Sequence, residues 1–463
     1  MTSTSTRSRR KSSRPPGSKE GDRPRRVDTA RNSNASTARS YLEAVGPGLI
    51  TGASDDDPSG IATYAQAGAK FGLAMLWAAL VTLPLQIAIQ EICDRTALST
   101  GRSLGELIRT RFGPRTRIAL GVLIGALITA NALNIAADLL AIGSGMHLLH
   151  AGPTTLWAAL AGVAITALLV TGSFDSIARA FKVLCTSLLS YIAVLFIVRV
   201  DWQKVLVGAV IPHVQFSGNY IGLLVGVLGT TISPYLFFWQ SLHRLEELEN
   251  EPKQKGRRRP ITLKARGPKS ARLKLRTSRF DVASGMTFSN IVMFSIIVAT
   301  ATTLGAHGQH DISTPDQAAR ALQPVAGHFA STIFALGFIG AGVLAVPVLA
   351  GAGSSGMAGL VGKTAGYSRR LKDAPVFYGL VAVGTIGGTV MSLFGLSPIK
   401  LLVLVAVLNG LAAAPFIVVV MKISSNRQIM GVNANSLPSS IIGWFTAVLM
   451  AAAAVGLFAT GSV

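Results

Sequence analysis

Charged residues are scarce in this sequence. Asp, Glu, Lys and Arg make up 14% of its 463 residues, whereas hydrophobic residues make up 50%. The mean hydropathy is +0.48. This composition sets the chain apart from soluble domains and predicts a membrane protein that crosses the bilayer many times.

Cysteine is also rare, and so are the signatures of a catalytic centre. The two cysteines, Cys93 and Cys185, are too few for a disulfide framework and are predicted to be buried thiols. No His-Glu-x-x-His or Gly-x-Ser-x-Gly pattern stands in a context that fits a hydrolase. We therefore predict neither an enzyme nor a resident cofactor.

Acidic residues number 21 against 43 basic ones, which gives a formal net charge of +22. Residues 1–40 are polar and basic, lack the apolar core of a signal peptide, and are predicted to be a disordered cytoplasmic tail. Basic segments beside membrane helices stay on the cytoplasmic side, so the charge needs no nucleic-acid partner. The predicted location is the plasma (inner) membrane of a prokaryote, with a cytoplasmic N-terminus.

The longest basic segment, residues 243–281, is predicted to be a cytoplasmic loop. One interpretation is a solvated loop that fixes the topology. The other is a regulatory element that binds anionic lipid, because clustered Lys and Arg attract anionic headgroups. The predicted loop at 93–117 is also rich in arginine.

Residues 41–463 form the predicted transmembrane domain. Apolar runs of bilayer-spanning length, broken by glycine, proline or charge, predict an all-α fold of about 11 transmembrane helices. The runs fall at about 44–68, 71–92, 118–149, 154–174, 180–200, 219–242, 282–304, 328–351, 376–395, 399–421 and 439–461.

Two of these spans carry a glycine- and proline-rich interruption near the middle. The first holds Asp57-Pro58-Ser59-Gly60, and the sixth holds Gly229-Thr230-Thr231-Ile232-Ser233-Pro234-Tyr235. Paired broken helices five spans apart predict an inverted-repeat transporter with its site at the membrane midplane. Repeat one would cover about 44–200 and repeat two about 219–421, with an extra helix at about 439–461.

The acid in the first break has two interpretations. Asp57 before Pro58 is a common helix N-cap, but a buried carboxylate is costly and usually marks an ion path. Asp55 and Asp56 either share that path or lie in a wet vestibule. Thr230, Thr231 and Ser233 could bond back to their own helix; opposite an acid, they are predicted oxygen donors to a hard cation.

A second intramembrane acid, Asp138, follows Asn131 and Asn134 on one face of the third span. A proton relay and polar contacts between helices are equally good interpretations of this face.

At these residues the sequence resembles the Nramp family of divalent metal transporters, from about residue 44 to 450. Nramp proteins carry Asp-Pro-Gly-Asn in the first helix and Ala-x-x-Met-Pro-His in the sixth. The resemblance implies a LeuT-type inverted repeat of two five-helix units plus one extra helix. It also implies a metal site made by Asp57 and the carbonyl groups of Ser54 and Thr230.

The chain departs from the family pattern at several ligands. Gly60 stands in place of the family's asparagine, Ser233 in place of its methionine, and Tyr235 in place of its histidine. Asp138 matches a family aspartate, but the glutamate three residues later is Ala141. The pattern looks like the Nramp-related magnesium transporters, in which a wider site accepts a largely hydrated ion without proton coupling. Asn409 in the tenth span is a further polar neighbour.

The sequence therefore predicts a transporter of magnesium, and of manganese, that works by alternating access without proton coupling. The alternative within transport is a proton-coupled manganese or iron importer with Asp138 as its acid. The alternative from another class is a membrane receptor that senses metal without flux.

Overall fold

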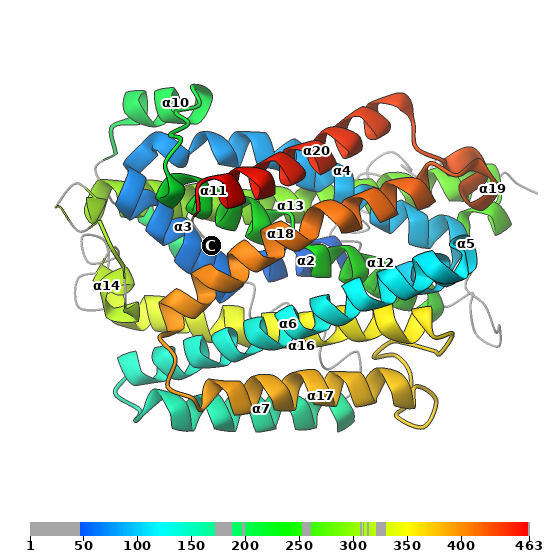
Figure 1. Ribbon diagram of the computed structural model, residues 1–463, viewed down its shortest axis with the longest axis horizontal. Helices are drawn as coiled ribbons and strands as arrows, with labels where there is room; N and C mark the ends of the chain where they lie inside the picture. The colour runs from blue at the N-terminus through cyan, green and yellow to red at the C-terminus, as the bar shows by residue number, and fades with distance from the viewer. Residues whose placement is uncertain are drawn as a thin grey trace, which may run out of the picture. The chain divides into compact units, whose positions relative to one another are not determined.

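A computed structural model describes residues 47–171, 188–196, 200–251, 261–305, 308, 310–312, 314–320 and 330–461. The tail 1–40, Cys185 and most of the fifth apolar run lie outside these ranges. All regular structure in the described part is helical (Figure 1): α2 (Pro47–Asp55), α3 (Pro58–Phe71), η1 (Gly72–Met75), α4 (Trp77–Thr100), α5 (Leu104–Arg111), α6 (Pro114–Leu148), α7 (Thr154–Thr171), α9 (Leu189–Val194), α10 (Trp202–Val210), α11 (Gly218–Thr231), α12 (Pro234–Asn250), η4 (Leu263–Ala265), α13 (Pro268–Thr303), α14 (Pro315–Arg320), α16 (Ala330–Leu360), α17 (Pro375–Ser392), α18 (Pro398–Ser424), α19 (Arg427–Met430), η7 (Gly431–Asn433) and α20 (Leu437–Ala459).

The ten other apolar runs correspond to helices or to pairs of helices. Within the described ranges, eight helical segments are each long and apolar enough to cross a bilayer, and α3 with η1 and α4 forms a further pair bent by 106°. The bend follows Gly72, whose φ of 57° suits a residue without a side chain. An all-α membrane domain is therefore confirmed.

Proline begins many of these helices because its fixed φ suits the first turn, where an N–H has no intrahelical partner. It opens α3 and α12, and therefore the second half of each broken span. The first span breaks between α2 and α3, and the sixth breaks between α11 and α12. Both interruptions lie where the sequence predicts them.

Two predicted loops are shorter than expected. In the segment 93–117, α4 continues to Thr100 and a short helix, α5, precedes α6. In the segment 243–281, α12 continues to Asn250 and α13 already begins at Pro268. Charged residues of the second segment pair with one another: Lys274 of α13 lies 2.7 Å from Glu247 and 2.9 Å from Glu251.

Close glycine contacts hold the broken helices against unbroken ones. A Cβ placed on Gly52 of α2 would lie 2.1 Å from the carbonyl oxygen of Gly285 in α13. A Cβ on Gly229 of α11 would lie 2.2 Å from the carbonyl oxygen of Ala406 in α18. Small residues allow backbones to approach this closely in membranes, so α13 and α18 set the positions of the two breaks.

The helices around this centre keep apolar side chains on their outer faces. α7 and α17 pack side by side and both contact α6 (Figure 1). Val163 on α7 and Val383 on α17 are each 66% exposed, and Val448 on α20 is 65% exposed. Exposed aliphatic residues on long apolar helices are suited to contact with lipid.

The contact between α11 and α18 leads to a stability prediction. Gly229→Ala should lower the thermal unfolding temperature of the detergent-solubilised protein, because overpacking of this kind costs about 1–3 kcal/mol. Gly222→Ala on the same helix is the matched control, since its new Cβ would meet only Leu457 at an ordinary 3.6 Å. Equal unfolding temperatures for the two variants would contradict the close packing.

Candidate functional site

In each break, a proline deprives one backbone carbonyl group of its regular hydrogen-bond donor. In an α-helix the carbonyl oxygen of one residue accepts from the N–H four residues later. Four residues after Ser54 stands Pro58, and four residues after Thr230 stands Pro234. Because proline has no N–H, neither carbonyl oxygen has its regular intrahelical donor.

Side-chain hydroxyl groups take the place of the missing donors. Tyr235 of α12 donates to the carbonyl oxygen of Ser54 across the two spans, at 3.4 Å. Ser233 donates to the carbonyl oxygens of Thr230 and Gly229, each at 2.7 Å. A hydroxyl group can rotate away, so these carbonyl oxygens remain available to a bound ion.

Asp57 lies at the centre of the two breaks and is 1% exposed. It is the N-cap of α3: its Oδ1 accepts from the backbone N–H of Gly60 at 2.8 Å and from Ser59 at 2.5 Å. Its Oδ2 accepts from Asn134 of α6 at 3.1 Å and from Tyr235 at 3.3 Å. Asp57 therefore caps one helix and also connects three spans.

The residues on the α11 side face the first break directly. A Cβ on Gly60 would lie 3.2 Å from Oγ1 of Thr230, tighter than an ordinary contact, so the two breaks pack closely at this glycine. Thr230 donates to the hydroxyl group of Tyr64 at 2.8 Å. Thr231 bonds back to the carbonyl oxygen of Val227 at 2.6 Å, as its local interpretation predicts.

Asp55 and Asp56 do not lie in a wet vestibule, since both are 0% exposed. Ser289 of α13 lies 2.6 Å from Oδ2 of Asp55 and 3.2 Å from Oδ1 of Asp56. The close approach of α13 to α2 at Gly52 shields this pair from solvent. The second oxygen of each carboxyl group has no hydrogen-bond partner in the described part of the chain.

Further buried oxygens near the breaks lack partners among the described residues. They are Oδ1 of Asn134, both carboxyl oxygens of Asp138, and the side-chain oxygen of Asn409. Asp138 lies one turn beyond Asn134 on α6, and Asn409 precedes Gly410, which packs against Gly229. Buried acceptors of this kind are normally satisfied by water or by an ion.

The donor set is dominated by oxygen. It consists of a carboxylate, two freed carbonyl groups, an amide and several hydroxyl groups, which suit a hard cation. No group of three or more His, Cys, Asp and Glu side chains in the described ranges is arranged to hold a metal ion. A sulfur atom does lie nearby, since Sδ of Met293 is 3.9 Å from Oγ1 of Thr231.

Four residues that make contacts at the site are not among the predicted site residues. The sequence marks Asn134 only by its spacing from Asp138 and does not predict its hydrogen bond to Asp57. Ser59 lies within the predicted motif, whereas Tyr64 stands one helical repeat beyond it. Ser289 has no signal in the sequence, because only the packing of α13 on α2 brings it to the acids.

Towards its charged end, α12 enters a buried ion network. Arg244 donates to Asp94 of α4 at 2.5 Å and to Asp281 of α13 at 2.9 Å. Gln240 also donates to Asp94, at 2.7 Å. Since Arg244 and both aspartates are almost completely buried, this network attaches the second half of the sixth span to α4 and α13.

Comparison with known proteins assigns the family. The family profile described as natural resistance-associated macrophage protein-like, Nramp, matches residues 48–460. The chain belongs to the Nramp family. Two relatives named divalent metal cation transporter MntH match this Nramp protein over almost its whole length. The one from Klebsiella pneumoniae is 27% identical and covers 89% of this chain and 93% of its own. The one from Yersinia pestis is 26% identical and covers 90% and 94%.

Solved structures agree on the fold of this Nramp protein. The manganese transporter of Eremococcus coleocola matches with a TM-score of 0.70 and 18% identity, over 92% of this chain and 88% of that one. Mhp1, a nucleobase-cation-symport-1 family transporter, matches with a TM-score of 0.52 and 14% identity, over 90% and 93%. The predicted LeuT-type fold with two broken spans is confirmed.

The network around Arg244 gives a second stability prediction. Arg244→Met should destabilise the protein by about 3–5 kcal/mol, because it removes the buried cation that pairs with Asp94. Arg279→Met is the control: this side chain is 56% exposed, and its ion pair with Glu91 is worth at most about 1 kcal/mol. Thermal unfolding in one detergent measures both, and a similar small loss in both variants would contradict the network's role.

Proposed function

We propose that this Nramp protein transports divalent cations, magnesium and manganese among them, by alternating access and without proton coupling. The observation that carries the proposal is the convergence of Asp57 with the proline-freed carbonyl groups of Ser54 and Thr230. The names of the relatives, which describe divalent metal cation and manganese transporters, support the general class. The cation is then the substrate and not a resident cofactor.

Magnesium is favoured by the chemistry at the breaks. Mg²⁺ loses its water reluctantly and is usually bound through one or two carboxylates with several waters retained. Gly60 and Ser233 stand in place of two larger ligands of the family, so fewer direct protein ligands compete with those waters. The unpartnered oxygens of Asn134, Asp138 and Asn409 are suited to accept from the water molecules of a hydrated ion.

Tyr235 supports transport without protons. It stands where the family has histidine, and its hydroxyl group donates to Asp57 as a neutral group. Ala141 removes a second acid on α6. Each repeat, one at about 44–200 and the other at about 219–421, contributes one broken helix. In alternating access the halves of these two helices would rearrange around this site.

Orientation follows from the basic residues. One cavity is lined by five basic residues from distant parts of the sequence: Arg102, Arg109, Lys264, Lys363 and Arg369. Basic residues next to membrane spans favour the cytoplasmic side. We therefore infer that this end is cytoplasmic, as in a plasma (inner) membrane protein of a prokaryote.

A proton-coupled manganese or iron importer is the second candidate. It is favoured by Asp138, a completely buried carboxyl group on α6 whose two oxygens have no partner among the described residues. Such an acid inside a membrane domain is a suitable proton carrier.

Metal uptake into liposomes tests the cation site. Asp57→Ser keeps an N-cap hydroxyl group but removes the charge, and should lower Mg²⁺ uptake by about tenfold or more, because a hydrogen bond or contact to a charged group is worth about 1.5–3 kcal/mol. Asp201→Ser, at the exposed N-cap of α10, is the matched control and should transport normally.

Competition in the same liposomes tests the ion. Excess Mg²⁺ should suppress Mn²⁺ uptake by the unaltered protein. Unchanged flux in Asp57→Ser would refute the cation site. Mn²⁺ uptake that excess Mg²⁺ does not reduce would favour the proton-coupled importer. Metal binding without any flux would favour a receptor.

Proton coupling has its own test, with a pH-sensitive dye trapped in the liposomes. During Mg²⁺ or Mn²⁺ uptake the internal pH should follow that of protein-free liposomes. Acidification that requires metal and disappears in Asp138→Asn would overturn uncoupled transport in favour of the proton-coupled importer.

A further inference from the structure

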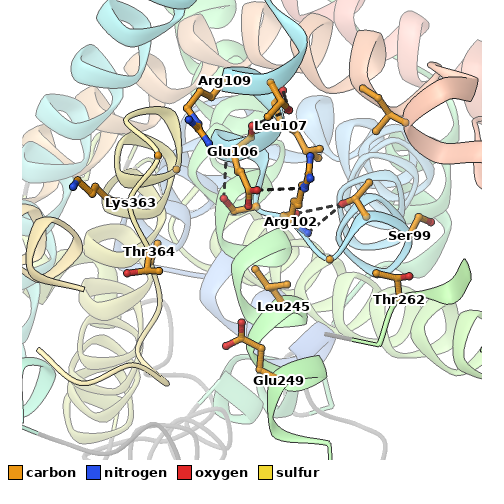
Figure 2. A pocket seen from close by; sticks show the side chains of 18 of the residues that line it. Ser99, Arg102, Glu106, Leu107, Arg109, Leu245, Glu249, Thr262, Lys363 and Thr364 are labelled. Atoms are coloured by element: carbon orange, nitrogen blue, oxygen red, sulfur yellow. Dashed lines mark hydrogen bonds and ion pairs between the residues drawn. The ribbon is translucent and has the colours of Figure 1, made fainter. Parts of the chain in front are cut away.

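A large cavity lies at the end of the helices where α5 and α19 are found, and none of the proposed cation-site residues lines it. Its volume is about 670 Å³, within the range of small-molecule sites. Figure 2 shows its walls: Arg102 follows α4, Glu106 comes from α5, Leu245 and Glu249 come from α12, and Lys363 follows α16. Segments distant in sequence therefore build one pocket.

The charge of this pocket is strongly positive. Five basic side chains and two acidic ones line it. Both acids are already paired: Glu106 lies 3.3 Å from Arg102, and Glu249 lies 2.6 Å from Arg369. Three cations remain without an acidic partner in the described ranges: Arg109, Lys264 and Lys363. Such an excess repels metal ions and attracts anions.

A hydroxyl group in the wall lacks a partner. Ser99, in the last turn of α4, is 2% exposed and lines the cavity, and its Oγ makes no hydrogen bond with any described residue. Thr100, Thr262 and Thr364 line the same cavity, and the hydroxyl groups of Thr100 and Thr364 already donate to the carbonyl oxygens of Thr96 and Asp373. A buried hydroxyl group without a partner is uncommon in proteins; the Ser99 oxygen is inaccessible and lies behind the cavity wall.

The backbone around the pocket is closely packed. A Cβ on Gly105 of α5 would lie 2.1 Å from the carbonyl oxygen of Gly356 in α16. At Gly362, which has a φ of 75°, a Cβ would lie 2.9 Å from the guanidinium of Arg109. The contacts place the cationic group of Arg109 beside the turn that follows α16. Arg109 itself is exposed, so its guanidinium can be reached from solvent.

We propose that this cavity binds a phosphate-bearing anion. Arg and Lys with serine and threonine hydroxyl groups are the side chains that recognise phosphate oxygens. The volume exceeds what a single phosphate ion needs, so a polyphosphate or a phosphate on a larger headgroup fits better. The free anion and the anionic lipid headgroup share this chemistry.

Binding here would act on the sixth span. α12 supplies Leu245 and Glu249 to the cavity, and the same helix carries Tyr235 at the break. An anion that contacts α12 together with α5 and the turn after α16 favours the conformation in which these walls are close. The pocket is thus a regulatory site that is separate from the cation site.

Binding of inorganic triphosphate to the full-length protein in detergent, with a chelator present to remove divalent cations, tests the proposal without measuring transport. Titration calorimetry should show saturable binding that weakens by about tenfold or more in Arg109→Gln/Lys363→Gln, because two charge-assisted contacts are lost. Arg115→Gln/Lys372→Gln is the matched control: both side chains are exposed and lie outside the cavity, so its binding should be unchanged.

The unfolding temperature separates lost binding from misfolding. Arg109 and Lys363 are both exposed, so without ligand Arg109→Gln/Lys363→Gln should unfold at the temperature of the unaltered protein while its triphosphate binding weakens. A second arm compares nanodiscs of phosphatidylcholine alone with nanodiscs that also contain phosphatidylglycerol. Stabilisation by phosphatidylglycerol that is lost only in Arg109→Gln/Lys363→Gln assigns the site to a lipid headgroup. The proposal fails if neither probe binds, or if both double variants lose binding equally.

Discussion

The arrangement of this protein depends on one backbone constraint, which is that a buried carbonyl group needs a donor where water is scarce. Pro58 and Pro234 deny that donor to Ser54 and Thr230, one in each broken span. The local consequence is two short helices in place of one long helix. The wider consequence is that side chains must come from elsewhere, and Tyr235 and Ser233 do so. The candidate site lies where the two spans that share this feature face each other.

The buried acid at the centre has a similar requirement. Asp57 satisfies its two oxygens with donors from its own helix, from α6 and from α12. A neutral phenol at Tyr235 can donate to Asp57 without bringing a charge, which an imidazolium could not do. Close glycine contacts keep α2 on α13 and α11 on α18, so the two breaks meet. The close helix packing therefore brings the carbonyl groups without regular donors and the buried carboxylate of Asp57 together at the two breaks.

Much of this arrangement follows from local chemistry and could be predicted. Glycine and proline marked both breaks, and the apolar runs marked the helices in the described part of the chain. Other features could not be predicted. Helix extends into both described ends of the segment 243–281, where Lys274 pairs with Glu247 and Glu251, and ion pairs between helices leave no periodic signal. Asp55 and Asp56 are buried where α13 packs on α2, and Ser289 meets them only through that packing.

The amino-acid sequence by itself determined where the helices break and which carbonyl groups lose their donors, since both depend on residues four apart in the chain. It also determined the family, through the motifs at Asp57 and Pro234. Only the tertiary structure decided which side chains replace the lost donors, which buried oxygens stay without partners, and where Arg109 and Lys363 converge on one cavity. Apart from the local bond from Ser233 to Thr230, these contacts join residues far apart in the chain, and their geometry depends on how whole helices pack.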